Sequence, residues 1–220
     1  MSRRALVQYL ELLKQSGIRY LYRSPDSDPE QQDRQQLLDS LRTRYSDCTK
    51  CPLAAGRINL VYGEGNPFAT VMIIGEAPGD KENLSGRPFV GAAGQLLDKM
   101  LAAIHLNREN IYIANIVKCR PEGNRNPSQD ERLACLPYLV EQIQIIRPRM
   151  LLVMGLVAAQ TLFGNTETLS WNRSHRNEFM GIPAWATYHP AALLRNQHWK
   201  RPAWEDLQEF QKAYESLTNA

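Results

Sequence analysis

The sequence predicts an α/β fold, a three-layer α/β/α sandwich with a central four-stranded parallel sheet. From residue 70 onward, short apolar runs alternate with segments of helical periodicity, which is the element order of parallel α/β sheets. The runs are nearly continuous, as expected for strands that helices cover on both faces. The length of 220 residues, with 43% hydrophobic and 22% charged residues, suits one domain with a short appendage and excludes disordered and disulfide-scaffold proteins.

Four strands are expected, each separated from the next by a helix. The apolar runs predict strands at residues 71–74, 111–114, 150–154 and 183–187. Apolar residues at helical spacing predict helices at residues 96–104, 127–143, a short stretch ending near Gly164, and 204–214. Ser128 and Glu131 have the spacing of a capping box at the start of the second of these helices.

Residues 1–45 are predicted to form an N-terminal helical appendage and polar linker, and residues 46–220 the functional domain. Leucines at helical spacing predict a helix over residues 5–13. A polar stretch with two prolines, 24–32, has the composition of a linker. A second helical pattern then ends near Tyr45.

Neither a signal peptide nor a membrane-spanning segment is predicted. Polar residues interrupt the N-terminal pattern, and the longest apolar run, 151–159, is far shorter than the roughly 20 residues that a spanning helix needs. We therefore expect a cytoplasmic protein with no membrane partner, in which thiols stay reduced. The formal net charge of +3 is too small by itself to indicate a polyanionic partner.

Chemically unusual residues follow three of the four predicted strands. The segments are Gly75-Glu76-Ala77-Pro78-Gly79, then Asn115 to Pro121, then Tyr188 to Asn196, which contains His189. Parallel sheets bind ligands at the carboxyl ends of their strands, so these segments are expected to line one cleft. Each motif is weak when taken singly: a lone histidine such as His189 is more often a half-buried structural residue.

The four cysteines, Cys48, Cys51, Cys119 and Cys135, are the second unusual feature. The two-residue spacer between the first two lets both sulfurs face one centre. Four thiolates suit zinc or an iron–sulfur cluster. Zinc sites usually combine two closely spaced pairs, and only one pair is close here. The pattern therefore favours a metal or cluster site over unligated core thiols, and a cluster over zinc.

Two basic segments border the expected cleft. Residues 118–125 contain Lys118, Arg120 and Arg125 against a single glutamate, and residues 173–201 contain five Lys or Arg against one glutamate. Such segments could contact DNA phosphates. A solvated basic surface explains either of them when it is taken alone.

Taken together, these motifs resemble the family 4 uracil-DNA glycosylases, the iron–sulfur type of the uracil-DNA glycosylase superfamily. The resemblance covers roughly residues 46–212. It rests on Cys-x2-Cys, Gly-Glu-Ala-Pro-Gly, Gly-Arg-Pro-Phe-Val-Gly, Asn-Ile-Val-Lys-Cys-Arg-Pro, Gly-Asn-Arg-x-Pro and His-Pro-Ala-Ala-Leu-Leu-Arg-Asn, in this order. It implies a four-stranded parallel sheet and a [4Fe-4S] cluster held by Cys48, Cys51, Cys119 and Cys135. It also implies a DNA-repair hydrolase that flips uracil out of DNA and hydrolyses the N-glycosidic bond, leaving free uracil and an abasic site.

The resemblance also implies a uracil pocket. Its members would be Glu76, Ala77, Pro78, Phe89, Asn115 and His189. Phe89 would stack on the flipped base, and the Asn115 amide would pair with the imide edge of uracil in a way that cytosine cannot reciprocate. His189 would donate a hydrogen bond to uracil O2 as negative charge grows there.

DNA contacts are implied by the segment after His189. Leu193 or Leu194 would fill the space that the flipped nucleotide leaves, and Arg195 would bind a phosphate. Arg120 and Arg125 are expected to be further DNA contacts. The expected partner is uracil-containing DNA, single- or double-stranded, and the protein is expected to be a monomer.

The group that positions the attacking water is left open. The best-known branch of the superfamily has Asp where this chain has Ala77, as is usual in family 4. Glu76 and Glu82 are the nearby carboxylates, and Glu82 with Asn124 is the expected organising pair. The related branch that crosslinks to abasic DNA uses a histidine in the loop that here covers residues 123–127, so no covalent trap is expected.

Two alternatives explain part of the pattern. A non-enzymatic iron–sulfur or zinc protein that binds DNA would account for the cysteines and the basic segments. It gives no reason for Phe89, Asn115 and His189 near the strand ends. A small-nucleotide hydrolase would account for the pocket, but the wedge-like pair Leu193 and Leu194 would be superfluous there.

Overall fold

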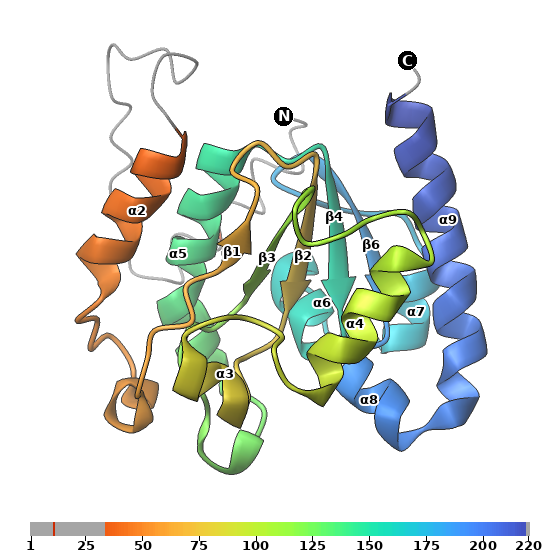
Figure 1. The fold of residues 1–220 in the computed structure, drawn as a ribbon. Coiled ribbons are helices and arrows are strands. Elements are labelled where there is room, and N and C mark those ends of the chain that lie inside the picture. The colour runs from red at the N-terminus through yellow and green to blue at the C-terminus, as the bar shows by residue number, and fades with distance from the viewer. Residues whose placement is uncertain (1–10, 12–33, 219–220) are drawn as a thin grey trace.

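The computed structural model of the chain describes residue 11 and residues 34–218 (Figure 1). The predicted linker over 24–32 lies outside the described residues, as does the predicted helix over 5–13 apart from residue 11.

A six-stranded sheet in the order β1-β3-β2-β4-β6-β5 forms the centre of the described part. Its strands are β1 (Glu64–Gly65), β2 (Val71–Gly75), β3 (Ile111–Asn115), β4 (Met150–Met154), β5 (Asn177–Phe179) and β6 (Ile182–Thr187). β3, β2, β4 and β6 pair in parallel and are the four strands that the sequence predicts. β1 and β5 pair antiparallel at the two edges. The sequence does not predict β1 and β5, because strands this short show no alternation of apolar and polar residues.

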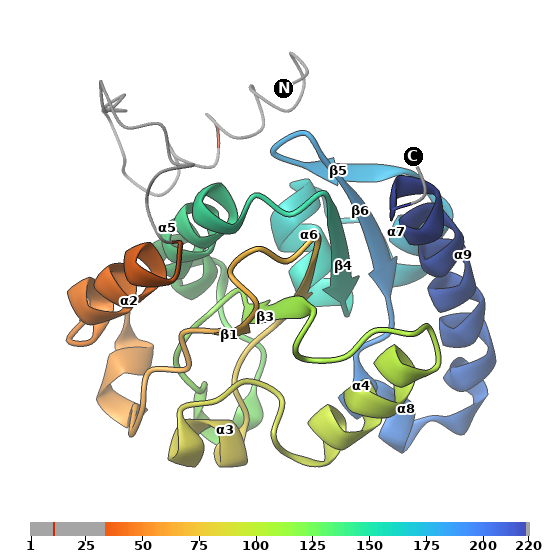
Figure 2. The same cartoon turned by 45° about the horizontal axis from the view of Figure 1, so that its top comes forward.

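Helices cover both faces of this sheet, which confirms the predicted three-layer α/β/α architecture. They are α2 (Arg34–Tyr45), α3 (Asp80–Ser85), α4 (Ala92–Ala102), α5 (Gln129–Ile146), α6 (Leu156–Phe163), α7 (Leu169–Ser174), α8 (Pro190–Arg195) and α9 (Lys200–Thr218), with 3-10 turns η1 (Pro52–Gly56), η2 (Glu122–Asn124) and η3 (Gln197–Trp199). α2, α5 and α6 contribute to the core on one face, and α4, α8 and α9 to the core on the other (Figure 2). α3, α7 and α8 are short helices that the sequence pattern did not predict.

Successive side chains of β2 enter different cores. Met72 and Ile74 pack in the cluster that contains α5 and α6, whereas Val71 and Ile73 pack in the cluster that contains α4 and α9. This is the two-residue period of a strand with both faces buried. It explains why the strand has no polar residue.

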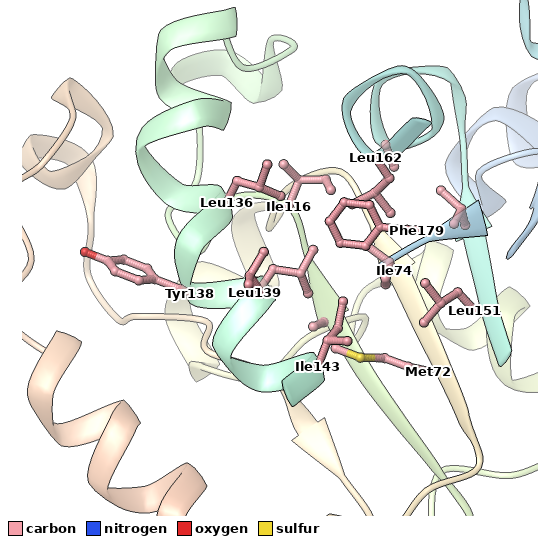
Figure 3. Packing of buried hydrophobic residues seen from close by; sticks show 14 of the residues in the cluster. Met72, Ile74, Ile116, Leu136, Tyr138, Leu139, Ile143, Leu151, Leu162 and Phe179 are labelled. Atoms are coloured by element: carbon pink, nitrogen blue, oxygen red, sulfur yellow. The ribbon is translucent and has the colours of Figure 1, made fainter. Parts of the chain in front are cut away.

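Helix α5 covers part of one face of the sheet. Figure 3 shows Leu136, Leu139 and Ile143 directed toward the strands and Tyr138 on the opposite side of the helix. Tyr138 stacks on Tyr45 of α2 with ring centroids 3.9 Å apart. α5 therefore joins the sheet on one side to α2 on the other.

The described part of the predicted appendage packs against this domain. Leu38 and Leu41 of α2 are 3% and 4% exposed and belong to the core around α5. Arg34 donates a hydrogen bond to Ile146 O at 2.8 Å. The domain boundary at residue 45 stays a prediction, but α2 is bound to the domain that follows it.

The predicted capping box starts α5. Ser128 Oγ accepts a hydrogen bond from Glu131 N at 3.2 Å, and the Glu131 carboxylate accepts one from Ser128 N at 2.7 Å. Hydrogen bonding from Arg125 and Ser128 lowers the pKa of Glu131 to about 2. Across the described ranges, no helix combines the length and apolar composition that crossing a bilayer demands.

Candidate active site

The carboxyl ends of the four parallel strands lie at the same end of the sheet, near α3 and α8 (Figure 1). Gly75 of β2 and Asn115 of β3 are paired at the last position of their register. β4 ends beside β6, where Gly155 N donates a hydrogen bond to Thr187 O at 2.8 Å, two residues before His189. The strand ends that the sequence analysis expects in one cleft are therefore neighbours.

Asn115 carries a buried polar atom that has no hydrogen-bond partner among the described residues. The residue is 1% exposed, and the atom is Oδ1 of its amide. A methyl group added at Gly75 would lie 2.4 Å from this oxygen and 2.6 Å from Cζ of Phe89. Glycine at this position therefore lets the amide and the phenyl ring approach each other. An unpaired buried acceptor costs about 1–3 kcal/mol, so a ligand that donates to it would be favoured.

Phe89 lies in the loop between α3 and α4 with a φ of 53°, a left-handed conformation that few non-glycine residues adopt. Arg108 holds this loop by donating hydrogen bonds to the carbonyl oxygens of Phe89 and of Pro88, the latter at 3.1 Å. Gly94 leaves room for it, because a Cβ there would lie 1.7 Å from Phe89 O. The Phe89 ring stacks near His189, with centroids 5.4 Å apart and an interplanar angle of 29°.

His189 is the N-cap of α8. Ala191 N donates a hydrogen bond to His189 Nδ1 at 3.2 Å, so in the neutral ring the proton is on Nε2. Burial, aided by Arg195, lowers the pKa of His189 to about 4, and the ring is neutral at physiological pH. A Cβ on Gly155, the residue between β4 and α6, would lie 3.1 Å from His189 Cβ, so the backbone there lies close to the histidine side chain. The site thus offers one neutral N–H donor beside the Phe89 ring.

The first motif provides the other predicted pocket residues. Glu76 and Ala77 are half-buried, and Pro78 is buried. Val117 N donates a hydrogen bond to Glu76 O at 3.1 Å, which ties the motif to the segment after β3. Burial raises the pKa of the Glu76 carboxyl, against a smaller lowering by Arg132.

Glu82 and Asn124 have different partners, although the sequence analysis expects them to act as a pair. The Glu82 carboxylate accepts hydrogen bonds from the backbone N–H groups of the two residues after Phe89, at 2.8 Å each, and from Gly79 N at 3.2 Å. Asn124 Oδ1 accepts one from Arg120 Nε at 2.8 Å. Glu82 therefore fastens the first motif to the Phe89 loop.

Lys118 is buried, which does not fit the basic DNA-contacting segment expected at residues 118–125. It is 0% exposed, and its Nζ donates hydrogen bonds to Asn115 O at 2.9 Å and Gln142 Oε1 at 2.6 Å. Burial lowers the pKa of Lys118 to about 8. The lysine supports the backbone of Asn115 from inside the protein, a role that a count of charges along the sequence cannot reveal.

The two arginines predicted as DNA contacts in this segment form ion pairs within the protein. Arg120 lies 2.9 Å from Asp80 of α3. Arg125 binds Glu131 at the start of α5 through two nitrogens, the shorter contact being 2.6 Å. These pairs fix the loop around η2.

The two leucines predicted as a wedge differ in exposure. Leu193 is 2% exposed and packs in the core with α4 and α9, whereas Leu194 is 43% exposed. Arg195, the next residue, is exposed as well. Of the predicted DNA contacts in α8, Leu194 and Arg195 are therefore accessible.

The four cysteines come from three segments that meet at the start of α5. Cys119 and Cys135 are buried, and the half-buried Cys48 and Cys51 pack against the same cluster. Burial raises the pKa of Cys119, and the nearby Cys51 and Cys48 add to this shift. Within the described ranges, no three His, Cys, Asp or Glu side chains gather closely enough to hold a single metal ion.

Several hydrogen-bond donors surround the sulfur atoms. Lys118 N donates to Cys135 Sγ at 3.3 Å, and Arg57 Nη1 donates to Cys119 Sγ at 3.6 Å. Cys48 Sγ lies 2.8 Å from the Tyr138 hydroxyl. Donors of this kind stabilise thiolates, which is the form that binds metals.

The sequence did not reveal the structural roles of two arginines, Arg108 and Arg173, the second of which was expected only as part of the basic segment 173–201. Arg108 holds the Phe89 loop, and Arg173 forms a largely buried ion pair with Asp206 at 2.7 Å. Their partners are 19 and 33 residues away in the chain, so no local spacing marks them. A cavity of about 910 Å³ lined partly by this ion pair contains none of the predicted site residues.

The fold and the site define a class of protein: an α/β protein with a buried amide oxygen, a phenyl ring and a neutral imidazole brought together at the carboxyl ends of its parallel strands. Comparisons with known proteins specify it further. Residues 62–211 match the family model of the uracil DNA glycosylase superfamily. The chain is 42% identical over 181 residues to a type-4 uracil-DNA glycosylase of Pyrobaculum aerophilum, covering 79% of this chain and 92% of that protein.

Further relatives give the same result. A type-4 uracil-DNA glycosylase of Saccharolobus solfataricus is 41% identical over 195 residues, which cover 83% of this chain and 87% of that protein. A type-4 uracil-DNA glycosylase of Thermotoga maritima is 40% identical over 169 residues, or 74% and 86% of the two chains. The chain belongs to the type-4 branch of the uracil-DNA glycosylase superfamily.

Proposed function

We propose that this protein is a DNA-repair enzyme that hydrolyses the N-glycosidic bond of uracil in DNA, leaving free uracil and an abasic site. The observation that carries the proposal is the buried, unpartnered Oδ1 of Asn115, beside the Phe89 ring. The relatives' names give uracil-DNA as the substrate of those proteins, and the geometry fits the same substrate here.

Uracil recognition rests on the amide of Asn115. Its Oδ1 accepts a hydrogen bond from uracil N3–H, and its Nδ2 donates one to uracil O4. Cytosine has an acceptor at N3 and a donor at the 4-position, so it would meet both amide atoms with the wrong polarity. Because the Asn115 oxygen is buried, this mismatch costs more than it would in water. Phe89 stacks on the base, and the close approach at Gly75 fixes the distance between the ring and the amide.

Bond cleavage rests on His189. As the bond between N1 and C1′ breaks, negative charge grows on uracil O2, and His189 Nε2–H donates a hydrogen bond to that oxygen. The low pKa keeps this donor present and neutral across physiological pH. A preorganised donor of this kind contributes a factor of about 10² to 10³ in rate.

Glu76 is the residue that we propose to bind the attacking water. A carboxylate whose pKa is raised by burial is a better acceptor of a water proton than an exposed one. Glu82 and Asn124 act as positioning residues in this proposal, since Glu82 holds the Phe89 loop and Asn124 binds Arg120. Leu194 fills the space of the flipped nucleotide, and its exposure supports this role.

The four cysteines fit a [4Fe-4S] cluster. Four cysteine thiols are the donor set that such clusters use, and N–H groups donate hydrogen bonds to the sulfur atoms of two of them. Structural zinc sites usually combine two closely spaced cysteine pairs, whereas Cys48 and Cys51 are the one closely spaced pair in this sequence. When bound, the cluster would cross-link Cys48 and Cys51 to Cys119 and Cys135, which stabilises the loop after Asn115.

Excision of uracil from oligonucleotides tests the proposed activity. Freshly purified protein is incubated with single- and double-stranded DNA containing one uracil, and abasic sites are cleaved with alkali. We expect strand cleavage, and a strong loss of it in His189→Ala and in Asn115→Ala. DNA binding without any cleavage by the wild-type protein would instead favour a non-enzymatic DNA-binding protein.

The cluster has its own measurement. Purified protein should be brown and contain iron and acid-labile sulfide in equal amounts. Cys135→Ser should lower the iron content and the thermal stability together. A colourless protein with one equivalent of zinc would contradict the cluster assignment while leaving the excision assay unaffected.

A further inference from the structure

The connection from α8 to α9 presents an exposed surface next to the candidate active site. Every residue from Leu194 to Arg201 is exposed. Trp199, in η3, is 39% exposed, and this stretch also contains the cations Arg195, Lys200 and Arg201. A large aromatic side chain among cations is typical of surfaces that bind single-stranded nucleic acid.

The Trp199 side chain is held in place by a neighbouring aromatic ring. Its ring stacks on that of Tyr188, with centroids 5.2 Å apart and an interplanar angle of 21°. On Tyr188, the residue before His189, the guanidinium of Arg173 lies 4.6 Å from the ring centroid. Arg173, Tyr188 and Trp199 therefore form a stack of three flat groups, which we call the Trp199 stack.

A buried ion pair anchors the inner end of this stack. Arg173 binds both carboxylate oxygens of Asp206, at 2.7 and 2.8 Å, and also donates to Pro202 O at 2.9 Å. Asp206 accepts a further hydrogen bond from Thr187 Oγ1 at 2.7 Å, at the end of β6. The side chains of Arg173 and Asp206 are only 14% and 10% exposed, so solvent screens this pair little.

Holding the Trp199 ring exposed and ordered costs free energy in the unbound protein, and this cost suggests that a ligand covers the ring. An exposed indole leaves apolar area in water, yet the ion pair and Tyr188 hold the ring in one orientation. A ring that is already ordered loses little side-chain entropy when a partner stacks on it. The flanking Arg195 and Lys200 favour a partner that carries negative charge.

We propose that Trp199 is a stacking platform for an unpaired base close to the flipped uracil, so that the enzyme acts preferentially on single-stranded DNA. The proposal rests on the proposed function, because uracil in the pocket defines which base reaches the Trp199 stack. In a duplex, the bases beside the flipped nucleotide remain paired and stacked on each other, and their faces are not free. In a single strand those faces are free, and every base has one.

The test compares Trp199→Ala with Trp204→Ala. Trp204 is a matched control, since it is 40% exposed, also near the start of α9. For both variants, kcat/KM of excision is measured on the same uracil sequence as a single strand and as a duplex. We expect Trp199→Ala to lose about tenfold on the single strand, the effect typical of one base–aromatic stack, and much less on the duplex. Trp204→Ala should behave as the wild type on both.

A scan of the substrate locates the stacked base. Single strands are made in which one nucleotide at a time, on either side of uracil, is replaced by a stable abasic analogue. One position should weaken excision by the wild type and by Trp199→Phe, but have no effect in Trp199→Ala. The same variants are tested for binding to a uracil-free oligothymidylate by fluorescence anisotropy, which requires no excision.

The outcomes separate this proposal from the proposed function. If neither the wild type nor Trp204→Ala excises uracil, the proposed function is refuted. Normal excision with equal single-strand rates for Trp199→Ala and Trp204→Ala would refute the stacking platform alone. Equal losses on single strand and duplex, with no position-dependent effect in the abasic scan, would also overturn it.

Discussion

The substitution Gly75→Ala tests the base pocket with the smallest possible change. Gly75 is the last residue of β2, and its φ lies outside the left-handed region, so alanine adds no backbone strain. The added methyl group would lie 2.4 Å from Asn115 Oδ1 and 2.6 Å from Phe89 Cζ. The two side chains that we propose to recognise uracil therefore make the closest contacts with the added methyl group.

The size of the effect follows from these contacts. To reach 3.0 Å, the shortest separation that real Cβ atoms show, the amide oxygen must move by about 0.6 Å and the ring by about 0.4 Å. Overpacking of this kind costs about 1–3 kcal/mol of stability, or roughly 3–10 °C in Tm for a domain of this size. A displacement approaching 1 Å in a catalytic site costs about 10²-fold in rate. We expect kcat/KM for uracil excision to fall by about 10- to 100-fold.

The assay measures excision kinetics and thermal unfolding on the same preparations. Gly56→Ala is the matched control, because a Cβ at that exposed glycine meets no atom within 4 Å, and it should change neither quantity. Assays well below the Tm of Gly75→Ala separate lost catalysis from lost folding. If the variant unfolds earlier but keeps its excision rate within about threefold of wild type, Asn115 and Phe89 do not define the base site.

Three further predictions concern His189, the Phe89 loop and the Arg173 anchor. Because the pKa of His189 falls from 6.5 to about 4 on folding, only the unfolded chain gains this proton between those pH values. The free energy of unfolding therefore drops by up to about 1.4 kcal/mol per pH unit as pH falls through that window. Urea unfolding of the wild type and of His189→Asn at pH 7 and 4.5 measures this drop. The same loss of stability in both proteins would contradict the prediction. Glu82→Gln should lower Tm and weaken substrate binding by loosening the Phe89 loop; a loss confined to kcat, with Tm unchanged, would mean that Glu82 acts on the water instead. Asp206→Ala leaves the Arg173 cation largely buried and unpaired, which costs about 3–5 kcal/mol in denaturant unfolding; a cost below about 1 kcal/mol would show that solvent screens this pair.

Much of the site follows from sequence order once the sheet is known to be parallel. Asn115 and Gly75 end neighbouring strands, so their meeting is a consequence of topology. The segments after β2 and β6 were recognised by residue types that a plain scaffold does not need. The spacing of the motifs also indicates the cysteine site. The connection from β3 to α5 contains Cys119 and leads into the helix that carries Cys135.

Pairings between distant side chains could not be predicted in this way. Lys118 looks like a surface cation in the sequence, but it donates to Asn115 O from the interior. Arg120 and Arg125 look like phosphate contacts, yet they pair with Asp80 and Glu131. Charge along the chain does not say which cation finds a carboxylate in the fold.

The sequence by itself determined the fold class, the four parallel strands, the glycosylase family that it resembles and the residue types at the strand ends. Hydrophobic periodicity and local motifs carry this information because strands and helices are short-range structures. Only the tertiary structure decided that Leu194 is exposed and Leu193 buried, that Glu82 fastens the Phe89 loop, and that Trp199 is held at the end of an anchored stack. These properties depend on side chains that meet across the sheet, and burial and pairing are set there by packing in three dimensions.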